Sequence, residues 1–400
     1  MSFTTHCRSC KSEHLVPVIK MGPQYLSDFR EDDTKPPRHR LTLVYCEFCH
    51  LVQLDETTPS EEMYHERYGF KSGINEAIKA DLKSNVETAL KWVPEPHDWL
   101  DIASNDGTLL SYVPDGTHRV GIDPILKLCE EAVENDRAEE ILGEFFDPNF
   151  FEDEEFDVIT SISMFYDLDD PNEFVSGVAS ILDADGVWVI QQNYLLTMME
   201  INAYDNICHE HLEYYSLHSL IPLLERHGLE IIDISLSDVN GGCIRTVVAH
   251  RGAHDIQDSV ILQLRKERQA GLNTVDAYVQ FALRVYKSIQ ETRDFVRQVN
   301  DEGKTIFIYG ASTRGNTIWQ ACGFTAEDLP YAVERNPEKF GKKIASLGIP
   351  IISEEDARNI KPDYMLVSPW FFRDVFVDRE KDYLEAGGHL VFPLPVFEIV

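Results

Sequence analysis

The sequence predicts an α/β protein with three domains. Three observations predict this fold class: two Cys-x-x-Cys pairs near the N-terminus, alternating strand and helix patterns through the middle, and a second such alternation after a long amphipathic helix. Strands that alternate with helices predict a parallel sheet whose carboxyl ends carry the binding residues. At 400 residues the chain is long enough for two or three domains. We place their boundaries at 1–63, 64–255 and 256–400.

The composition is that of an ordinary soluble protein, with 43% hydrophobic and 26% charged residues. No run of 18 apolar residues occurs, and the first residues lack the apolar stretch of a signal peptide, so a cytoplasmic location is expected. The formal net charge of −33 argues against nucleic-acid and membrane partners, because its field repels phosphate. This net charge is still compatible with a small phosphorylated ligand that binds in a locally basic pocket.

Four of the eight cysteines form two Cys-x-x-Cys pairs, CRSC and CEFC. These cysteines are Cys7, Cys10, Cys46 and Cys49. Each pair can aim two thiolates at one point, and two pairs complete the tetrahedral shell that zinc prefers. A redox disulfide is the alternative, but it needs one pair and not two that bracket a loop. We therefore predict one structural zinc, with His6 and His50 surplus to its shell. The four scattered cysteines are expected to be buried thiols.

The middle domain opens near Tyr64 and shows four strand patterns. HDWLDIASNDGTLLSYV predicts a strand, a tight turn and the start of a helix. HRVGIDPILKLCEEAVEN predicts a second strand, which ends in Asp123, and an amphipathic helix. EEFDVITSISMFYDL and GVWVIQQNYLL, the latter after a DADG turn, predict the third and fourth strands. This order is typical of a Rossmann-like domain.

The first turn of this domain indicates the kind of ligand. An acid that ends the second strand, here Asp123, hydrogen-bonds ribose hydroxyls in such folds. The GxGxxG motif is absent, because the turn reads DIASNDG and retains only Gly107. Without the glycine triplet the turn offers no obvious pyrophosphate cradle. A ligand with a ribose and no phosphate fits better, and S-adenosylmethionine is such a ligand.

The C-terminal domain begins after a predicted long helix. Its apolar stripe predicts a core face at Val275, Tyr278, Ala282, Val285, Ile289, Val296 and Val299. TIFIYGASTRGNTIWQACG then predicts a strand, a glycine-containing turn and a helix. A second strand ends in Glu334, and a third ends at Ser368, Pro369 and Trp370. This is a second α/β unit with a nucleotide-style layout.

The stretch DNICHEHLEYYS places two histidines and two acids within five residues. His209 and His211 are two apart, whereas a zinc pair on a helix needs histidines at i and i+4. On a helix they would point to nearly opposite sides, and on a strand they would share a face, with Glu210 on the other. The spacing leaves a metal site, an acid/base pair and a solvated turn open.

Seven motifs, taken together and in order, resemble one family over nearly the whole chain. They are the paired Cys-x-x-Cys with CEFCHLVQL, then YGFKSGINEAI, ASNDGTLL, HEHLEYYSLHSL, NGGCIR, YGASTRGNT and VSPWFF. With these motifs the chain resembles the sugar C-methyltransferases, which methylate a carbon beside the ketone of nucleotide-linked deoxysugars. The resemblance implies a zinc-binding N-terminal domain, a central class I methyltransferase domain that binds S-adenosylmethionine, and a C-terminal α/β domain that helps to hold the nucleotide-sugar.

The resemblance also implies roles for individual residues. The HEH segment would lie at the active site and serve acid/base chemistry, with His211 as the general base and Glu210 as its partner. Asp167 is the rival base, since it follows the third strand where relatives often carry histidine. Tyr68, within YGFKSG, would contact cofactor and substrate, against the alternative of an ordinary helix start.

The candidate ligand-binding residues follow from the same motifs. The phenylalanine pair in GEFFD is expected near the adenine. The candidates for the cofactor are Lys71, Ser72, Asp101, Ala103, Ser104, Asn105, Gly107, Asp123, Pro124, Glu144, Phe145, Phe146, Ser163 and Met164. The candidates for the substrate are Tyr215, Gly310, Ala311, Ser312, Arg314, Gly315, Glu334 and Trp370, of which Arg314 would meet the diphosphate. Each candidate also has a plainer interpretation. Arg314 would then be a surface arginine, Trp370 a core residue, and Asn240 to Gly242 a turn between strands.

The chain departs from the family pattern at three positions. Cys208 stands where the sugar enzymes commonly have tyrosine, Asp167 where they often have histidine, and Ala103 where they tend to have glycine. The leading hypothesis is an S-adenosylmethionine-dependent C-methyltransferase that acts on a small-molecule nucleotide-sugar. A different acceptor or reaction with the same cofactor, such as O-methylation, is the second, and a non-catalytic binding module is the third. Monomer and homodimer both stay open.

Overall fold

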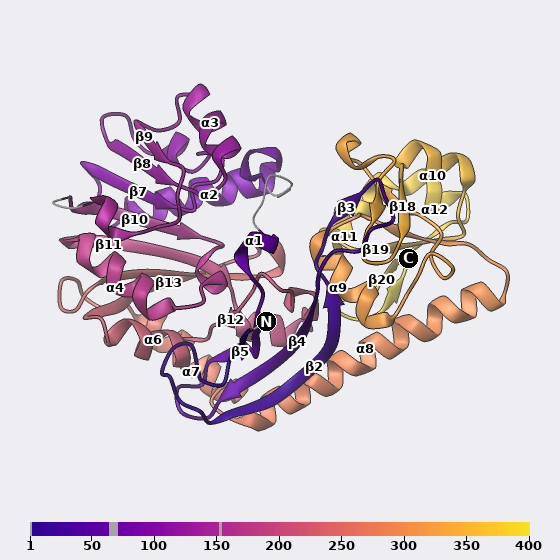
Figure 1. The fold of residues 1–400 in the computed structure, drawn as a ribbon, viewed down its shortest axis with the longest axis horizontal. Coiled ribbons are helices and arrows are strands. Elements are labelled where there is room, and N and C mark those ends of the chain that lie inside the picture. Colours follow the sequence, from indigo (N-terminus) through magenta and orange to yellow (C-terminus); the bar gives the residue numbers. More distant parts are fainter. Residues whose placement is uncertain (1, 64–70, 152–153) are drawn as a thin grey trace. The chain divides into compact units, whose positions relative to one another are not determined.

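In the computed structural model, which describes residues 2–63, 71–151 and 154–400, the chain forms two compact units (Figure 1). The first unit comprises Met1–Val16, Val44–Leu196 and Leu212–Val275. The second unit comprises Pro17–Leu43, Thr197–His211 and Asp276–Val400. Each unit therefore combines stretches that lie far apart in the sequence.

The candidate site residues divide between these two units. Asp123 and the other cofactor candidates belong to the first unit, whereas His211 and the ASTRG turn belong to the second. Tyr68 lies outside the described residues. The division into domains at 1–63, 64–255 and 256–400 stays a prediction.

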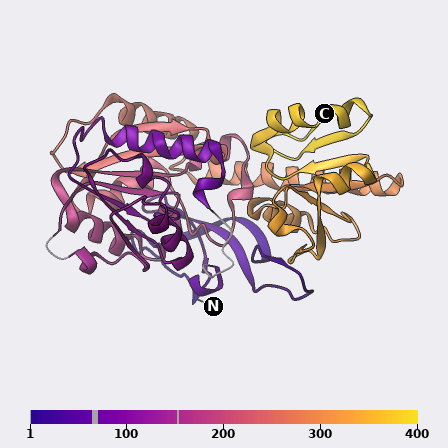
Figure 2. The ribbon, with the colours of Figure 1, turned by 90° about the horizontal axis from the view of Figure 1, so that it is seen from above.

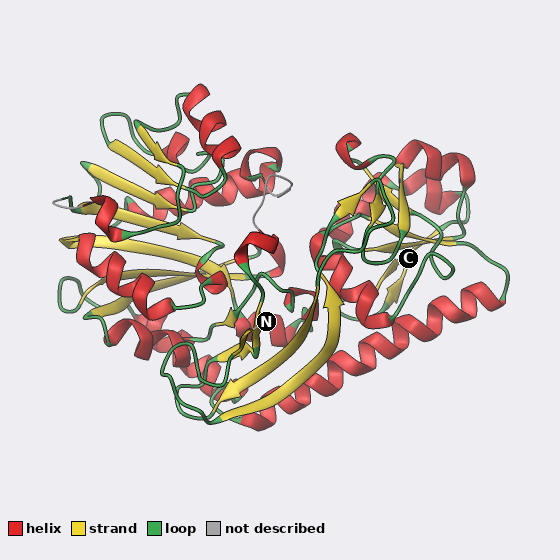
Figure 3. Ribbon diagram, viewed as in Figure 1, coloured by secondary structure: helices red, strands yellow, loops and turns green. Residues whose placement is uncertain are grey.

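A seven-stranded sheet forms the centre of the first unit, in the order β13-β14-β11-β10-β7-β8-β9 (Figure 3). Its strands are β7 Asp98–Ile102, β8 His118–Ile122, β9 Glu140–Leu142, β10 Phe156–Ile162, β11 Leu182–Asn193, β13 Leu229–Ser237 and β14 Cys243–His250. The five strands from β11 to β9 are parallel, which confirms the predicted parallel sheet, and β14 adds to β11 in the antiparallel sense. The parallel strands bring their carboxyl ends to one edge of the sheet.

Helices of the first unit follow the strands, as the alternation predicts, with one difference. They are α1 Ser60–Met63, α2 Glu76–Ala89, α3 Leu126–Glu134, α4 Pro171–Ile181, α6 Leu217–Glu225 and α7 Asp258–Ala270, and α5 Leu195–Glu200 begins in the first unit and continues into the second. The helix expected after β7 is only a 3₁₀ turn, Leu110–Tyr112. Pro114 explains this, because proline disfavours helical backbone at the residue before it, and Val113 is extended.

Short strands organise the N-terminal residues. They are β1 Ser2–Phe3 and β6 Glu56–Thr57, which pair with each other, and β2 Leu15–Tyr25, β4 Arg38–Cys46, β5 Val52–Leu54 and β12 Glu213–Tyr214, which form a four-stranded sheet. β2 and β4 contribute residues to both units. Cys46 ends β4 and Cys49 lies in the turn before β5, so sheet pairing holds both of these cysteines in place.

An eight-stranded sheet forms the second unit, in the order β21-β20-β19-β15-β16-β18-β17-β3. Its strands are β3 Phe29–Arg30, β15 Ile306–Tyr309, β16 Ala332–Glu334, β17 Lys343–Ile344, β18 Ile349–Ser353, β19 Tyr364–Val367, β20 His389–Phe392 and β21 Glu398–Ile399. The three strands predicted here are β15, β16 and β19, and they are parallel. β3, β17 and β21 have only two residues each, and β3 comes from the N-terminal part of the chain.

The long helix α8, Val275–Asp301, confirms the predicted apolar stripe. Six of its seven predicted positions, Tyr278 to Val299, are buried, and only Val275 at the first residue is half-buried. Figure 2 shows α8 in orange beside the strands of the second unit, where Ser288 Oγ donates to the Pro393 carbonyl at 3.3 Å. The other helices of this unit are α9 Thr313–Cys322, α10 Glu354–Ile360, α11 Arg373–Arg379 and α12 Lys381–Glu385. None of the helices in the described ranges has the length and apolar character that a membrane span requires.

Candidate metal centre and active site

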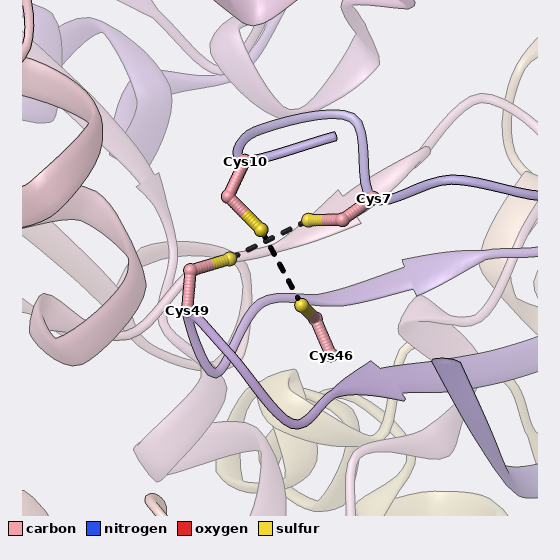
Figure 4. A group of neighbouring side chains, drawn as sticks. All are labelled: Cys7, Cys10, Cys46 and Cys49. Atoms are coloured by element: carbon pink, nitrogen blue, oxygen red, sulfur yellow. Dashed lines mark hydrogen bonds between the residues drawn. The ribbon is translucent and has the colours of Figure 1, made fainter. Parts of the chain in front are cut away.

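The four paired cysteines meet at one point of the first unit (Figure 4). All four sulfur atoms lie within 4.8 Å of one another, with Cys7 and Cys49 at 3.4 Å and Cys10 and Cys46 at 3.6 Å. Zinc at about 2.3 Å from each sulfur would place tetrahedral ligands roughly 3.8 Å apart. The donor set and its spacing therefore fit a closed, structural zinc site. Bare thiolates at this distance would repel each other, and a cation removes that cost.

The two cysteine turns have the same backbone path. Lys11 N–H donates to the Cys7 carbonyl, and His50 N–H donates to the Cys46 carbonyl, both at 2.9 Å. Lys11 and His50 each adopt a positive φ, 60° and 65°, directly after the second cysteine of their pair. This turn brings the two thiolates of a pair to the same side. The His50 ring lies against Tyr45, with Nδ1 at 2.6 Å from the tyrosine hydroxyl, as expected of a residue surplus to the metal shell.

A cavity of about 750 Å³ lies in the first unit at the carboxyl ends of β7, β8 and β10. Among the candidates for the cofactor, the residues that line it are Ser72, Ala103, Asn105, Asp123, Pro124, Glu144, Phe145, Phe146, Ser163 and Met164, and the rival base Asp167 lines it too. The two phenylalanines of GEFFD lie on the cavity wall, and Phe145 is 59% exposed. An exposed aromatic ring beside such a cavity can stack on a flat base.

Asp123 joins the two turns that form the cavity floor. Its Oδ2 accepts from Asn105 N–H and its Oδ1 accepts from Ile125 N–H, both at 2.9 Å. Asn105 Oδ1 in turn accepts from Ser72 N–H at 3.0 Å. Burial raises the pKa of Asp123. Ala103, where the family tends to have glycine, has a φ of 61°, a conformation that favours glycine. The backbone of Ala103 is therefore strained, and the turn keeps its conformation all the same.

Four candidates for the cofactor do not line the cavity but support its turns. Lys71 forms an ion pair with Glu131. Asp101 is buried in β7 and accepts from Thr160 Oγ1 at 2.6 Å, and burial raises its pKa to about 7. A Cβ at Gly107 would lie 2.9 Å from that of Ala132, and Ser104 packs against Gly121. These four residues therefore support the turns around the cavity without lining it.

The cavity lining is strongly acidic. Its carboxylic acids are Asp123, Glu144, Asp147, Asp167, Asp170 and Glu173, and none of the described lining residues is lysine, arginine or histidine. Such a wall favours a cationic ligand. The sulfonium and ammonium groups of S-adenosylmethionine are cations, so the donor set fits this cofactor. Sequence reasoning missed Asp147, and it missed Asp170 and Glu173 because the start of α4 reads as an ordinary helix N-terminus.

The HEH segment is irregular, and its two histidines have different surroundings within the second unit. His209 is 4% exposed, its Nε2 lies 3.3 Å from the His39 carbonyl, and burial lowers its pKa to about 4. His211 Nδ1 lies 2.9 Å from the Asn206 carbonyl. A carbonyl only accepts, so Nδ1 carries the hydrogen and Nε2 carries the lone pair. Burial, and then the Arg314 guanidinium, lower the pKa of His211 to about 3.

The substrate candidates of the second unit surround the turn after β15. Ser312 Oγ caps α9 by accepting from Gly315 N–H at 3.0 Å, and Glu334 accepts from Ala311 N–H at 3.1 Å. A Cβ on Gly315 would lie 2.6 Å from Ser368, and Gly310 has a φ of 95°. These contacts bring β15, β16 and β19 together at their carboxyl ends.

Three residues have surroundings that differ from those expected. Arg314 forms an ion pair with Asp205 at 2.8 Å, so its charge is already partnered, and Trp370 is 5% exposed rather than an open stacking surface. Tyr215 is 1% exposed, and its ring packs against Phe165 in the core of the first unit. A further residue, His218 of the HEHLEYYSLHSL motif, is largely buried, and its Nδ1 lies 2.9 Å from a carboxylate oxygen of Glu267. Long-range partners decide each of these positions.

Three family models match successive parts of the chain. They are described as a zinc binding domain (residues 7–64), a methyltransferase domain (residues 74–234) and a C-methyltransferase C-terminal domain (residues 238–395). NovU, a C-methyltransferase of Streptomyces niveus, is 30% identical over 406 residues, which cover 97% of this chain and 95% of NovU. The chain belongs to the C-methyltransferase family. It is an S-adenosylmethionine-dependent methyltransferase with a zinc-binding cysteine quartet.

Similar solved structures cover about half of this C-methyltransferase or less, from 43% to 51% of its length. N-methyltransferase NodS of Bradyrhizobium japonicum, in complex with S-adenosyl-L-homocysteine, has a TM-score of 0.37 and 13% identity over 47% of this chain and 93% of NodS. An S-adenosylmethionine-dependent methyltransferase of Clostridium acetobutylicum has a TM-score of 0.36 and 14% identity over 44% of this chain and 92% of its own. At these scores the likenesses carry no argument about this C-methyltransferase.

Asp123 provides a direct test of the cofactor site in this C-methyltransferase. We expect Asp123→Ala to weaken S-adenosylmethionine binding, because each charge-assisted hydrogen bond to the ribose is worth roughly 1.5–3 kcal/mol. The same change releases Asn105 and Ile125, so the turns also lose support. Calorimetric titration measures the affinity, and Glu139→Ala is the control, since that acid pairs with Arg119 away from the cavity lining. Unchanged affinity in Asp123→Ala would show that the ribose lies elsewhere.

Proposed function

We propose that this C-methyltransferase adds a methyl group to a carbon beside the ketone of a nucleotide-linked deoxysugar. The motif resemblance over nearly the whole chain supports the sugar acceptor. The observation that carries the proposal is the state of His211, whose Nδ1 donates to a fixed carbonyl and whose Nε2 lone pair is uncharged over the physiological range. A carbon nucleophile requires removal of a C–H proton, which O-methylation of an acidic hydroxyl does not.

The proposed reaction needs a methyl donor and a base. S-adenosylmethionine, when bound, supplies an electrophilic methyl group, and Asp123 with the acidic wall of the cavity would hold its ribose and its cationic groups. His211 Nε2 takes the proton from the carbon beside the ketone. The electron pair of that C–H bond passes into the enolate. The enolate carbon would then form the new bond to the methyl group as the methyl–sulfur bond breaks and its electron pair stays on the sulfur. A neutral imidazole suits the first step, because it can accept a proton without first losing one.

Glu210 is the proposed partner of His211. Burial raises the pKa of the Glu210 carboxyl, which is what we expect of an acid away from bulk water. A carboxyl of raised pKa can stabilise an imidazolium once the proton has moved, or hand a proton on. His209 is not proposed as a base, because its ring packs at 6.1 Å from the His39 ring within the core.

The nucleotide part of the acceptor is proposed to bind the second unit. Backbone N–H groups at the start of α9 suit a diphosphate, and Gly310 lets a ligand approach the backbone closely. Glu334, at the end of β16, is proposed to lie near the nucleoside. Its carboxylate already accepts from Ala311, Arg335 and Asn336 N–H, so it also fixes the loop that would meet the ligand.

Product analysis tests the acceptor class. We expect incubation with isotope-labelled S-adenosylmethionine and a panel of nucleotide 4-keto sugars to yield one sugar with a label on carbon, detected by mass spectrometry and carbon NMR. The same sugar without its nucleotide should react far more slowly, because the contacts of the second unit would be lost. Label on a sugar oxygen would favour the O-methylation alternative, and equal rates with and without the nucleotide would refute the nucleotide site.

A further inference from the structure

Asp205 holds two side chains of the second unit with one carboxylate oxygen. Its Oδ2 accepts from Arg314 Nε at 2.9 Å and from Trp370 Nε1 at 3.0 Å, and Arg314 Nη2 lies 2.8 Å from the same oxygen. Asp205 is fully buried and the Arg314 side chain is 17% exposed. The Phe371 ring lies 4.9 Å from the guanidinium carbon, which fixes the plane of the guanidinium group from one side. The hydrogen bond, the ion pair and the ring contact together hold this arginine in one orientation.

This arrangement continues through the backbone to His211. Asp205 and Asn206 belong to the same 3₁₀ turn, Tyr204–Asn206, and the Asn206 carbonyl is the acceptor of His211 Nδ1–H. The position of that carbonyl determines which ring nitrogen carries the hydrogen and where Nε2 points. α9, through Arg314, and the 3₁₀ turn Trp370–Phe372 thereby anchor the turn that orients His211.

We propose that Arg314 is a positioning residue for proton removal, which acts through Asp205 and Asn206 on His211. The proposal rests on the proposed role of His211 as the general base, and it replaces the expectation that Arg314 binds a diphosphate. A guanidinium that already neutralises a buried carboxylate cannot turn to a phosphate without leaving Asp205 uncompensated, which is costly. The contacts that hold Arg314 against Asp205 make it a poor phosphate ligand, and they also fix the turn that contains Asp205.

Arg314 also has an electrostatic effect on His211. Burial lowers the pKa of His211 most, and the positive charge of Arg314 lowers it further. The other titratable groups on these two elements, in the described part of the second unit, are Tyr204 and Asp205 on the 3₁₀ turn, and Cys208, His209 and Glu210 on the segment of His211 itself. Without Arg314, His211 loses a neighbouring positive charge, and the negative charge of Asp205 is no longer neutralised. Both changes favour the imidazolium form of His211. The acid limb of the pH–rate profile should therefore move to higher pH.

Two substitutions separate the anchoring from the charge. Arg314→Gln removes both, and we expect kcat and the rate of solvent deuterium exchange beside the ketone to fall about 10²-fold, as for a reacting group displaced by about 1 Å. Its acid limb should move to higher pH. Arg314→Lys keeps the charge and loses the Nε hydrogen bond and the planar group that packs on Phe371, so its rate should fall while its acid limb stays in place. Cofactor affinity should be unchanged in both, because the cofactor cavity lies within the first unit.

Arg293→Gln is the matched control. Arg293 Nε donates to the Cys322 carbonyl at 2.9 Å and anchors the other end of α9, so this variant loses a comparable contact with no route to His211. We expect its kcat and pH profile to match the unchanged protein. If Arg314→Gln does not fold, Arg314→Lys and Asp205→Asn supply the same comparison, with a reduced kcat expected of each.

The outcomes separate this proposal from the proposed function. A higher KM for the nucleotide-sugar with kcat and the acid limb unchanged would make Arg314 a ligand of the acceptor and overturn the positioning role. If His211→Ala abolishes exchange while Arg314→Gln and Arg314→Lys retain it in full, the base is correct and only the positioning role fails. If exchange persists in His211→Ala, the proposed function of His211 itself is wrong.

Discussion

Replacement of His211 by alanine should lower the rate of methyl transfer about 10²–10⁴-fold, the contribution expected of a general base. S-adenosylmethionine affinity should not change, because the cavity that fits the cofactor is lined by residues of the first unit. The physical reason is that Nε2 of His211 carries the lone pair, and alanine offers no replacement for it. Single-turnover kinetics with labelled cofactor measure the loss.

Solvent deuterium exchange isolates the proton-removal step from methyl transfer. We expect exchange at the carbon beside the ketone to disappear in His211→Ala and to persist in His209→Gln, because His209 is a packed core residue. Asp167→Asn is the decisive comparison, since Asp167 lines the cavity and is the rival base. Exchange that persists in His211→Ala and vanishes in Asp167→Asn would assign the base to Asp167.

The pH dependence of the reaction provides an independent check on the base. The pKa of His211 is lowered to about 3, below the ordinary histidine value of 6.5, so the imidazole stays neutral through the whole range in between. Activity that depends on neutral His211 is therefore retained as the pH falls through 6.5 and is lost only near the lowered pKa. An acid limb of kcat/KM at the ordinary histidine value would contradict this assignment.

Removal of zinc should unfold the N-terminal part of the first unit. In zinc-finger peptides the binding energy of a structural zinc is roughly 10–16 kcal/mol at pH 7, and it acts as folding energy. A net loss of only about 3 kcal/mol would lower the melting midpoint by roughly 6–12 °C for a unit of this size. Calorimetry with and without a strong chelator measures the shift, and metal analysis should find one zinc per chain.

The cysteine substitutions have a matched control in the same chain. Cys46→Ser should reproduce the chelator effect, whereas Cys322→Ser should not, because Cys322 is a buried thiol of α9 that donates to the Ile289 carbonyl. The loss should spread along the neighbouring strands. Arg8, between the first two cysteines, donates to the Leu54 carbonyl at 2.6 Å and lies 3.7 Å from Glu213 of β12. Purified protein without zinc, and with four thiols that react freely, would refute the metal centre.

Local pattern was sufficient to predict the parts of the site that lie within single elements. The spacing of the cysteine pairs predicted the quartet, because a Cys-x-x-Cys turn of fixed geometry can present its thiolates in only one way. The place of Asp123 at the cavity could be predicted because a strand pattern ends at that residue, and parallel strands bring their ends to one edge. The stripe of α8 was predictable because one helical face must be apolar to be buried.

Only the tertiary structure decided which charged and aromatic side chains have partners. Nothing in the local sequence pairs Asp205 with Arg314, or His218 with Glu267, since each contact joins elements far apart in the chain. Arg314 at a helix start and Trp370 after a strand were read as ligand-binding residues, yet both bond to the same buried carboxylate. The physical reason is that periodicity reports the face of an element that is buried, whereas the partner of a buried charge depends on which elements pack together.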